Sequence, residues 1–195
     1  GHGSLPHQGI NSVVVGSSIV MDLQSVVSRE ISPLESAVVT IGSFHSGTRF
    51  NVLASDALLE GTTRCFNPEI RGNFLKIIER IIKNTAASYR AEARLEYTLG
   101  TPPVINDGEC SKIAQATTEK LFGYEGLGYM EKVTGGEDFA YFMEKAPGAL
   151  AFVGIRNEEK EAAYPHHHPR FNMDEDALEM GTALYAQYAL DFLNS

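Results

Sequence analysis

The sequence is poor in cysteine and in long apolar runs, and each shortage excludes a class of protein. Its two cysteines, Cys65 and Cys110, lie far apart without a CxxC or other zinc-binding spacing. Neither a disulfide framework nor a structural zinc site is therefore expected, and both residues are interpreted as buried thiols. No stretch reaches the roughly 18 consecutive apolar residues of a membrane span, and the N-terminus lacks the basic-then-apolar pattern of a secretion signal.

Basic residues are also few: 16 Lys and Arg stand against 25 Asp and Glu, which gives a formal net charge of −9. The basic residues are scattered along the chain, whereas binding to nucleic-acid phosphates requires them to be clustered. We therefore expect no nucleic-acid partner and no membrane partner, and a soluble, cytoplasmic protein. The apolar residues make up 43% of the 195-residue chain, which is enough for the core of one large domain or two small ones.

Hydrophobic periodicity and turn residues divide the first hundred residues into helices and strands. Spacings of three and four between apolar residues predict a helix, β-branched segments bounded by Gly or Ser-Asp predict strands, and Asn67 followed by Pro68 predicts a helix start. In order, we predict a helix over 10–29, strands over 36–44, 50–53 and 57–66, a helix from Asn67 through Ile82 and a strand over 93–99. This order indicates a small α+β sandwich domain over 1–100, in which two helices cover one face of an antiparallel sheet whose first strand is missing.

A turn-rich segment over 101–107 predicts the domain boundary, so the second domain is expected over 101–195. Its predicted elements are helices over 109–122, 137–145 and 175–193, the last with Asp174 as N-cap, and a strand over 149–155. A single strand between helices cannot form its own sheet. We therefore expect this half to belong to a larger α/β layer, which makes the whole chain α/β.

Two short motifs in the second half suggest a ligand site. His167 lies in Pro-His-His-His-Pro-Arg-Phe (165–171), and histidine is the commonest side-chain metal ligand. Gly135 and Gly136 precede Glu137 and Asp138, and such a glycine pair permits close approach of the backbone to a ligand. The two acidic residues fit equally well as pocket lining and as the N-terminus of a helix, where they would interact with the helix dipole.

Several segments, in order along almost the whole chain, resemble the M20 metallopeptidase family. They are similar to its amidohydrolase subfamily, which includes hippurate hydrolase and N-acyl-amino-acid amidohydrolases. The resemblance is carried by residues 1–7 (Gly-His-Gly-Ser-Leu-Pro-His), 47–52 (Gly-Thr-Arg-Phe-Asn-Val), 61–64 (Gly-Thr-Thr-Arg), 103–107 (Pro-Val-Ile-Asn-Asp), 136–140 (Gly-Glu-Asp-Phe-Ala), 147–148 (Pro-Gly) and 167–175. Each segment alone is weak evidence for the family, whereas the complete set in this order is specific for it.

The resemblance implies hydrolysis of a small amide by two divalent metal ions, zinc or manganese, with a glutamate as general acid and base. It implies that His167 is a metal ligand and that His2 is a catalytic histidine of the lid, which reaches the substrate carbonyl across a homodimer. It further implies that Asn51 and Arg64 bind an N-acyl amino acid or peptide-like substrate. Gly136 is expected to be a further substrate-binding residue. For Arg64 the pattern itself also allows a surface salt bridge, because Glu60 lies on the same strand face.

The family's His-x-Asp, Cys-x-His and Glu-Glu segments would lie before Gly1 and are not in this sequence. One histidine cannot supply the converging ligands of metal-assisted hydrolysis, so we expect at most a partial metal site and an inactive isolated chain. Two alternatives stay open. The chain could be a non-catalytic dimerisation or carboxylate-binding module, or part of a dipeptidase or deacylase from a neighbouring subfamily.

Overall fold

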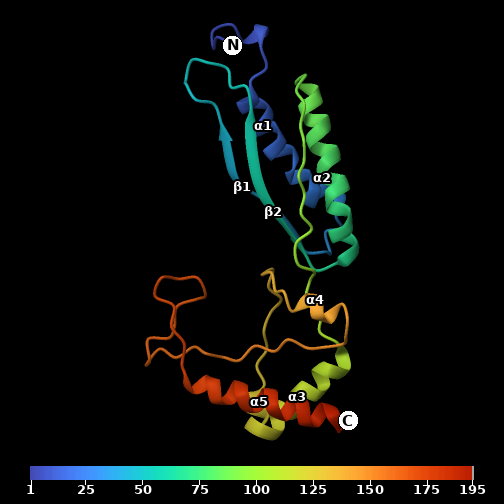
Figure 1. The fold of residues 1–195 in the computed structure, drawn as a ribbon, viewed down its shortest axis with the longest axis vertical. Helices are drawn as coiled ribbons and strands as arrows, with labels where there is room; N and C mark the ends of the chain where they lie inside the picture. Colours follow the sequence, from blue (N-terminus) through green and yellow to red (C-terminus); the bar gives the residue numbers. More distant parts are fainter. Residues whose placement is uncertain (195) are drawn as a thin grey trace. The chain divides into compact units, whose positions relative to one another are not determined.

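The computed structural model describes residues 1–194, and these form two compact units. The first comprises Gly1–Pro103 and Thr134–Gly136, and the second comprises Val104–Val133 and Glu137–Ser195. Figure 1 shows their elements. The described residues contain five α-helices and one two-stranded antiparallel sheet, a mixed α/β fold as expected. No helix in the described part is long and apolar enough to cross a membrane.

The sheet of the first unit is a hairpin of β1 (Ala37–Ser46) and β2 (Ala57–Cys65). The pairing runs from Ala37 opposite Cys65 to Ser46 opposite Ala57, with a bulge between Ile41 and Ser43. Both strands lie within two residues of the predicted ranges. The third predicted strand over 50–53 is wrong as a strand, because only a single bridge between His2 and Val52 forms there among the described residues.

Two helices, α1 (Ser12–Asp22) and α2 (Pro68–Ser88), pack against this sheet. The Asn67 side chain accepts hydrogen bonds from the N–H groups of Glu69 (2.9 Å) and Ile70 (3.4 Å), which confirms the predicted start of α2. The first predicted helix is shorter than expected, since α1 ends at Asp22 and a π-helical turn, η2 (Val26–Glu30), follows it. A 3₁₀ turn, η1 (Pro6–Gln8), precedes α1.

The core of the first unit lies between these helices and the sheet. Phe74, Val26 and Ala86 are the most deeply buried of its members. The complete cluster of buried residues is Val15, Ile19, Leu23, Val26, Ile31, Phe74, Ile78, Ile81, Ile82 and Ala86. The isoleucine stripe of α2, formed by Ile70, Ile77, Ile78, Ile81 and Ile82, therefore faces this core.

The segment 91–97 is extended and follows α2 without joining a ladder (Figure 1). Its alternate residues Ala91, Ala93, Leu95 and Tyr97 pack against the core, and the Tyr97 hydroxyl lies 2.8 Å from that of Thr63. The predicted strand over 93–99 is therefore wrong as an assigned strand, although its alternation of inner and outer side chains is present. A strand needs a hydrogen-bonded neighbour, and no segment within 1–194 takes that place.

The second unit is built from α3 (Gly108–Phe122), a 3₁₀ turn η3 (Tyr124–Gly126), the single-turn α4 (Ala140–Met143) and α5 (Asp176–Leu193). The helix predicted over 137–145 is therefore much shorter than expected. The strand predicted over 149–155 is wrong for the same reason as 93–99: the segment is extended, but no strand within the described residues pairs with it.

Helices α3 and α5 are joined by polar contacts around Asp191. Its carboxylate accepts hydrogen bonds from the fully buried Thr117 hydroxyl at 2.9 Å and from Gln187 at 2.8 Å, and it pairs with Lys120 at 2.9 Å. These donors lower the pKa of Asp191 and keep it ionised at neutral pH. The α3–α5 pair is the frame on which the loops of this unit are held.

The two cysteines differ in their surroundings. Cys110, on α3, is buried as expected, whereas Cys65, at the end of β2, is only half-buried. Burial still raises the pKa of the Cys65 thiol, and the positive charge of Arg71 opposes that effect. Both are free thiols in the described part of the chain.

Candidate functional site

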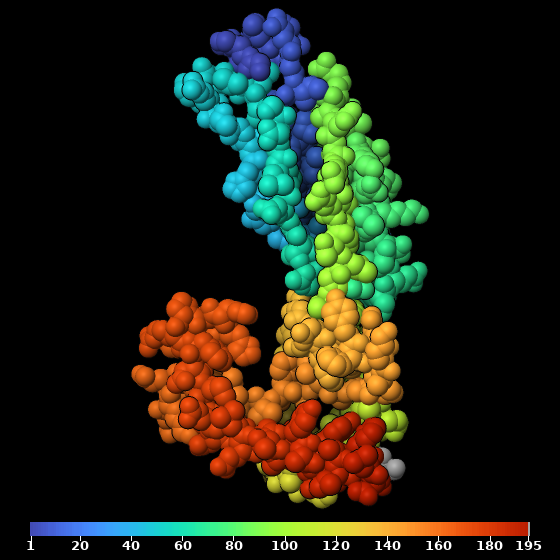
Figure 2. Space-filling model, in the orientation of Figure 1, coloured from blue at the N-terminus to red at the C-terminus, as the bar shows by residue number. Residues whose placement is uncertain are grey.

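The histidine motif lies in a long loop of the second unit, residues 156–174, between the extended segment 149–155 and α5. In the space-filling view its orange atoms form a lobe that stands out from the red helix (Figure 2). Loops of this length without secondary structure are uncommon and are usually functional or disordered. This one is ordered by contacts at its tip and at its base.

At the tip, aromatic and cationic groups pack around Tyr164. The His168 ring stacks on the Tyr164 ring with centroids 4.4 Å apart, and the Arg170 guanidinium carbon lies 4.6 Å from the same ring centre. The His166 ring contacts Phe171 edge to face at 5.1 Å. His168 Nδ1 also accepts the backbone N–H of Arg170 at 3.1 Å. The two flanking histidines are therefore held by the loop itself.

His167 differs from both neighbours. Its φ is +66°, which is uncommon for a residue other than glycine, and its side chain is exposed. No ring contact or hydrogen bond of its imidazole is found with residues 1–194. The loop thus uses His166 and His168 for packing and leaves the ring of His167 available to a ligand.

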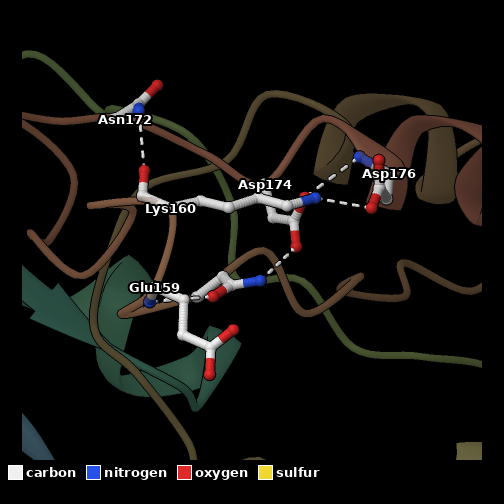
Figure 3. Close-up of polar contacts among 6 residues, drawn as sticks. Glu159, Lys160, Asn172, Asp174 and Asp176 are labelled. Atoms are coloured by element: carbon white, nitrogen blue, oxygen red, sulfur yellow. Dashed lines mark hydrogen bonds and ion pairs between the residues drawn. The ribbon is translucent and has the colours of Figure 1, made fainter.

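At the base, Lys160 on the outgoing limb of the loop contacts three residues on the returning limb (Figure 3). Its Nζ lies 2.6 Å from Asp174 Oδ1 and 2.5 Å from Asp176 Oδ2, and its carbonyl oxygen accepts a hydrogen bond from the Asn172 amide at 3.4 Å. Asp174 Oδ2 accepts a further bond from the Asn157 amide at 2.7 Å. Hydrogen bonds from Lys160 and Asn157 hold the pKa of Asp174 at about 2.

These contacts form one cluster, called here the loop clasp, of Asn157, Lys160, Asn172, Asp174 and Asp176. The sequence analysis does not predict it. The sequence predicts Asp174 only as the N-cap of α5. Its Oδ1 does accept the N–H of Asp176 at 3.2 Å, although α5 begins at Asp176 and its N-cap is Glu175. A usable signal was present. An acidic pair and a lysine flank the histidine motif at nearly equal distances, which favours closure of the loop by an ion pair.

In the first unit the structure brings His2 and Asn51 together. The Gly3 N–H donates to the Asn51 carbonyl at 2.8 Å, and the Leu53 N–H donates to the Gly1 carbonyl at 2.8 Å. A Cβ on Gly3 would lie only 2.9 Å from the Asn51 oxygen, so this close approach requires glycine. The exposed His2 ring accepts hydrogen bonds through Nδ1 from the Ser4 N–H (3.1 Å) and hydroxyl (2.8 Å).

Arg64 lies at the opposite end of the hairpin from this pair. It is opposite Val38 near the open end, whereas Asn51 belongs to the connection at the other end of the hairpin, beyond the pair Ser46 and Ala57. The seven residue steps from Ala57 to Arg64 span about 23 Å at roughly 3.3 Å per residue. The Arg64 guanidinium donates to the Thr62 hydroxyl and to the Thr63 carbonyl. One chain therefore does not place Arg64 beside His2 and Asn51.

The remaining expected residues, Gly136 and Glu137, are neighbours in sequence, and the boundary between the two units falls between them. Gly136 belongs to the first unit, where a Cβ at this position would lie 3.2 Å from the Thr101 hydroxyl. In the second unit the Glu137 carboxylate accepts the Phe139 N–H at 3.2 Å. This contact is typical of a helix N-terminus, which is one of the two roles expected for Glu137 and Asp138.

The described residues do not form a complete site for metal ions. An exposed imidazole such as that of His167 is a suitable donor for a divalent metal, but residues 1–194 contain no group of three or more His, Cys, Asp or Glu side chains that could hold one. A two-metal centre therefore does not fit these residues by themselves.

Comparison with known proteins identifies the family. Residues 2–191 match the peptidase family M20/M25/M40, and the chain belongs to this family. It is 36% identical over 195 residues, its full length, to an N-acetylcysteine deacetylase of Bacillus subtilis, of which it covers 50%. It is 32% identical over 195 residues, again its full length, to thermostable carboxypeptidase 2 of Saccharolobus solfataricus, of which it covers 49%.

A solved structure supports the same assignment. A dinuclear metal binding peptidase of this family from Bacillus subtilis superposes with a TM-score of 0.79 at 31% identity, over 95% of this chain and 47% of that one. The chain thus spans about half the length of the relatives it matches. The fold and the family are therefore shown, and the activity of the whole protein is a separate question.

Proposed function

We propose that the whole protein hydrolyses the amide bond of N-acyl amino acids or related small amides with the help of divalent metal ions, zinc or manganese. The observation that carries this proposal is the match of almost the whole chain to the M20/M25/M40 family, with a deacetylase of an N-acyl amino acid among its relatives. Because the described residues do not complete a metal site, the isolated 195-residue chain is expected to be inactive.

Each unit has its own proposed role. The first unit acts as the lid and dimerisation domain, and the second as part of the catalytic domain. A groove of about 550 Å³ along α5 supports the second assignment, because its lining is almost entirely apolar: Val153, Ile155, Met173, Ala177, Leu178, Gly181, Thr182, Tyr185 and Ala186. Together with the unpaired extended segment 149–155, this lining is typical of a layer that is completed by further strands.

His167 is proposed to supply one metal ligand. The support is that its imidazole is exposed, whereas the rings of His166 and His168 pack against other residues of the loop. His167→Ala is expected to abolish hydrolysis of an N-acetyl amino acid by the whole protein while the far-UV circular dichroism spectrum stays unchanged. His166→Ala is the matched control, and it should retain most activity. Full turnover and full metal content in His167→Ala would contradict the assignment.

His2 is proposed to act in catalysis, with Asn51, Arg64 and Gly136 binding the substrate. Since about 23 Å of β2 separates Arg64 from His2 and Asn51, one small substrate cannot contact both ends of the hairpin in a single chain. We therefore propose that a homodimer supplies Arg64 from one copy and His2 with Asn51 from the other. Such sharing is possible in a two-fold assembly because each interface contact occurs twice.

Mixing two inactive variants tests this sharing. His2→Ala and Arg64→Ala should each be nearly inactive. After unfolding and refolding together in equal amounts, roughly one quarter of the wild-type activity should return, because half of the dimers are mixed and each contains one intact site. Mixing His2→Ala with Asn51→Ala is the control and should restore none, since both residues come from the same copy. The absence of recovery in the first mixture would contradict the shared site.

Two other functions remain as alternatives with their own observations. A peptidase acting on free peptides is favoured by the similarity to the carboxypeptidase, and comparing rates on N-acetyl amino acids and free dipeptides separates the two. A non-catalytic dimerisation or carboxylate-binding module is favoured by the incomplete metal site of the described residues. Binding of an N-acetyl amino acid without turnover by the whole protein would support that module.

A further inference from the structure

We infer that Lys160 is a positioning residue, which holds the histidine loop closed and so fixes the direction in which His167 points. This inference rests on the proposed role of His167, and it concerns a residue that does not touch the imidazole itself. Lys160 is the one member of the loop clasp whose side chain reaches two carboxylates at once, those of Asp174 and Asp176.

The geometry explains why one side chain has this effect. Residues 156–174 have few internal backbone hydrogen bonds, so closing them into one arrangement costs conformational entropy. Lys160 joins the outgoing limb to the returning limb at the point where Asp174 also donates its N–H to the Ile155 carbonyl at 3.0 Å. Fixing the base in this way shortens the free part of the loop to the stretch that contains the histidines.

The burial of Asp174 separates its pair with Lys160 from an ordinary surface ion pair, whereas the Asp176 side chain is 84% exposed. Exposed pairs contribute little because water and salt screen them. The Asp174 side chain is only 18% exposed, and both of its oxygens have partners, Lys160 on one and Asn157 on the other. The Lys160 side chain is 45% exposed. We therefore expect its removal to loosen the loop without unfolding the rest of the second unit.

The tip depends on the base through the backbone. His167 has a left-handed conformation, which residues other than glycine hold only where the surrounding structure determines it. The stacking of His168 and Arg170 on Tyr164 supplies part of that surrounding structure, as does the hydrogen bond from the His168 N–H to the Pro165 carbonyl at 3.2 Å. The clasp acts on this turn indirectly, because it holds the two limbs of the loop together. When the base opens, we expect His167 to sample other backbone conformations.

Amide hydrogen exchange measures the loop directly. In Lys160→Met, the amides of Ala162, Phe171 and Asp174, which donate to Asn157, His168 and Ile155 in the closed loop, should exchange at least about tenfold faster. Lys160→Arg should restore slow exchange, because a guanidinium can still reach both carboxylates. Lys112→Met is the matched control, since it removes a lysine from an exposed ion pair on α3 of the same unit. If Lys160→Met proves too unstable, Asp176→Asn removes one of the two pairs and should give a smaller increase at the same amides.

Activity of the whole protein then tests the consequence for the site. Lys160→Met should lower kcat about tenfold with little change in KM, and Lys160→Arg should recover it. Unchanged exchange in Lys160→Met, or faster exchange with unchanged kcat, would overturn the inference. Full activity in His167→Ala would instead contradict the proposed function, while the exchange result would still report on the clasp.

Discussion

Phe74 offers the sharpest test of how the first unit is held together. It lies on the inner face of α2 in the middle of the core cluster and is only 1% exposed. The next residue along the helix, Leu75, is 45% exposed. Truncating each to alanine therefore compares a buried and an exposed large side chain on the same turn of one helix.

The expected magnitude follows from the burial of Phe74. A buried aromatic side chain removes roughly 150–250 Å² from water, which at about 25 cal/mol per Å² corresponds to roughly 4–6 kcal/mol for the whole side chain. Alanine retains part of that burial and a cavity is left behind, so Phe74→Ala should lower the free energy of unfolding by about 3–5 kcal/mol. Leu75→Ala should lower it by less than about 1 kcal/mol, because little area is lost.

Urea unfolding followed by far-UV circular dichroism is suited to this measurement because the chain contains no tryptophan. Since the two units can unfold separately, hydrogen exchange resolved by mass spectrometry should place the loss in α1, α2, β1 and β2, with α3 and α5 unchanged. Equal destabilisation by Phe74→Ala and Leu75→Ala would show that the core of this unit is not where the structure places it.

Two further predictions concern the sheet and the response to acid. A Cβ on Gly61 would overlap the backbone carbonyl oxygen of Thr40, so Gly61→Ala should destabilise the first unit by about 1–3 kcal/mol. Gly42→Ala, with nothing within 4 Å of its Cβ, should change the stability little. Equal thermal shifts for the two variants would contradict this. The N–H groups at the start of α3 lower the pKa of Asp107, and the partners of Asp174 hold its pKa at about 2. Their stabilising contributions are therefore complete above the unfolded pKa of about 4 and are lost as the pH falls through the lower folded values. Exchange at the first turn of α3 should accelerate below pH 4 in the wild type, and Asp107→Asn, which keeps the cap acceptor, should show no such acceleration.

Elements governed by local chemistry could be predicted from the sequence. Asn67 followed by Pro68 specifies a helix start because the amide caps free N–H groups and proline needs none, and α2 begins there. The β-branched runs around the hairpin specify β1 and β2, and the isoleucine stripe specifies the face of α2 that meets the core. The family resemblance also depends only on the order of short segments, and it was confirmed by comparison.

Contacts between residues distant in sequence could be decided only by the tertiary structure. The segments 93–99 and 149–155 have the composition of strands, but a strand requires a neighbour, and none of the described residues provides one. The clasp of Lys160 with Asp174 and Asp176, the adjacency of His2 and Asn51, and the separation of Arg64 from both arise from how the chain closes on itself. Sequence thus determined which groups are available for chemistry, and the tertiary structure decided which of them meet, because side-chain distance depends on packing rather than on separation along the chain.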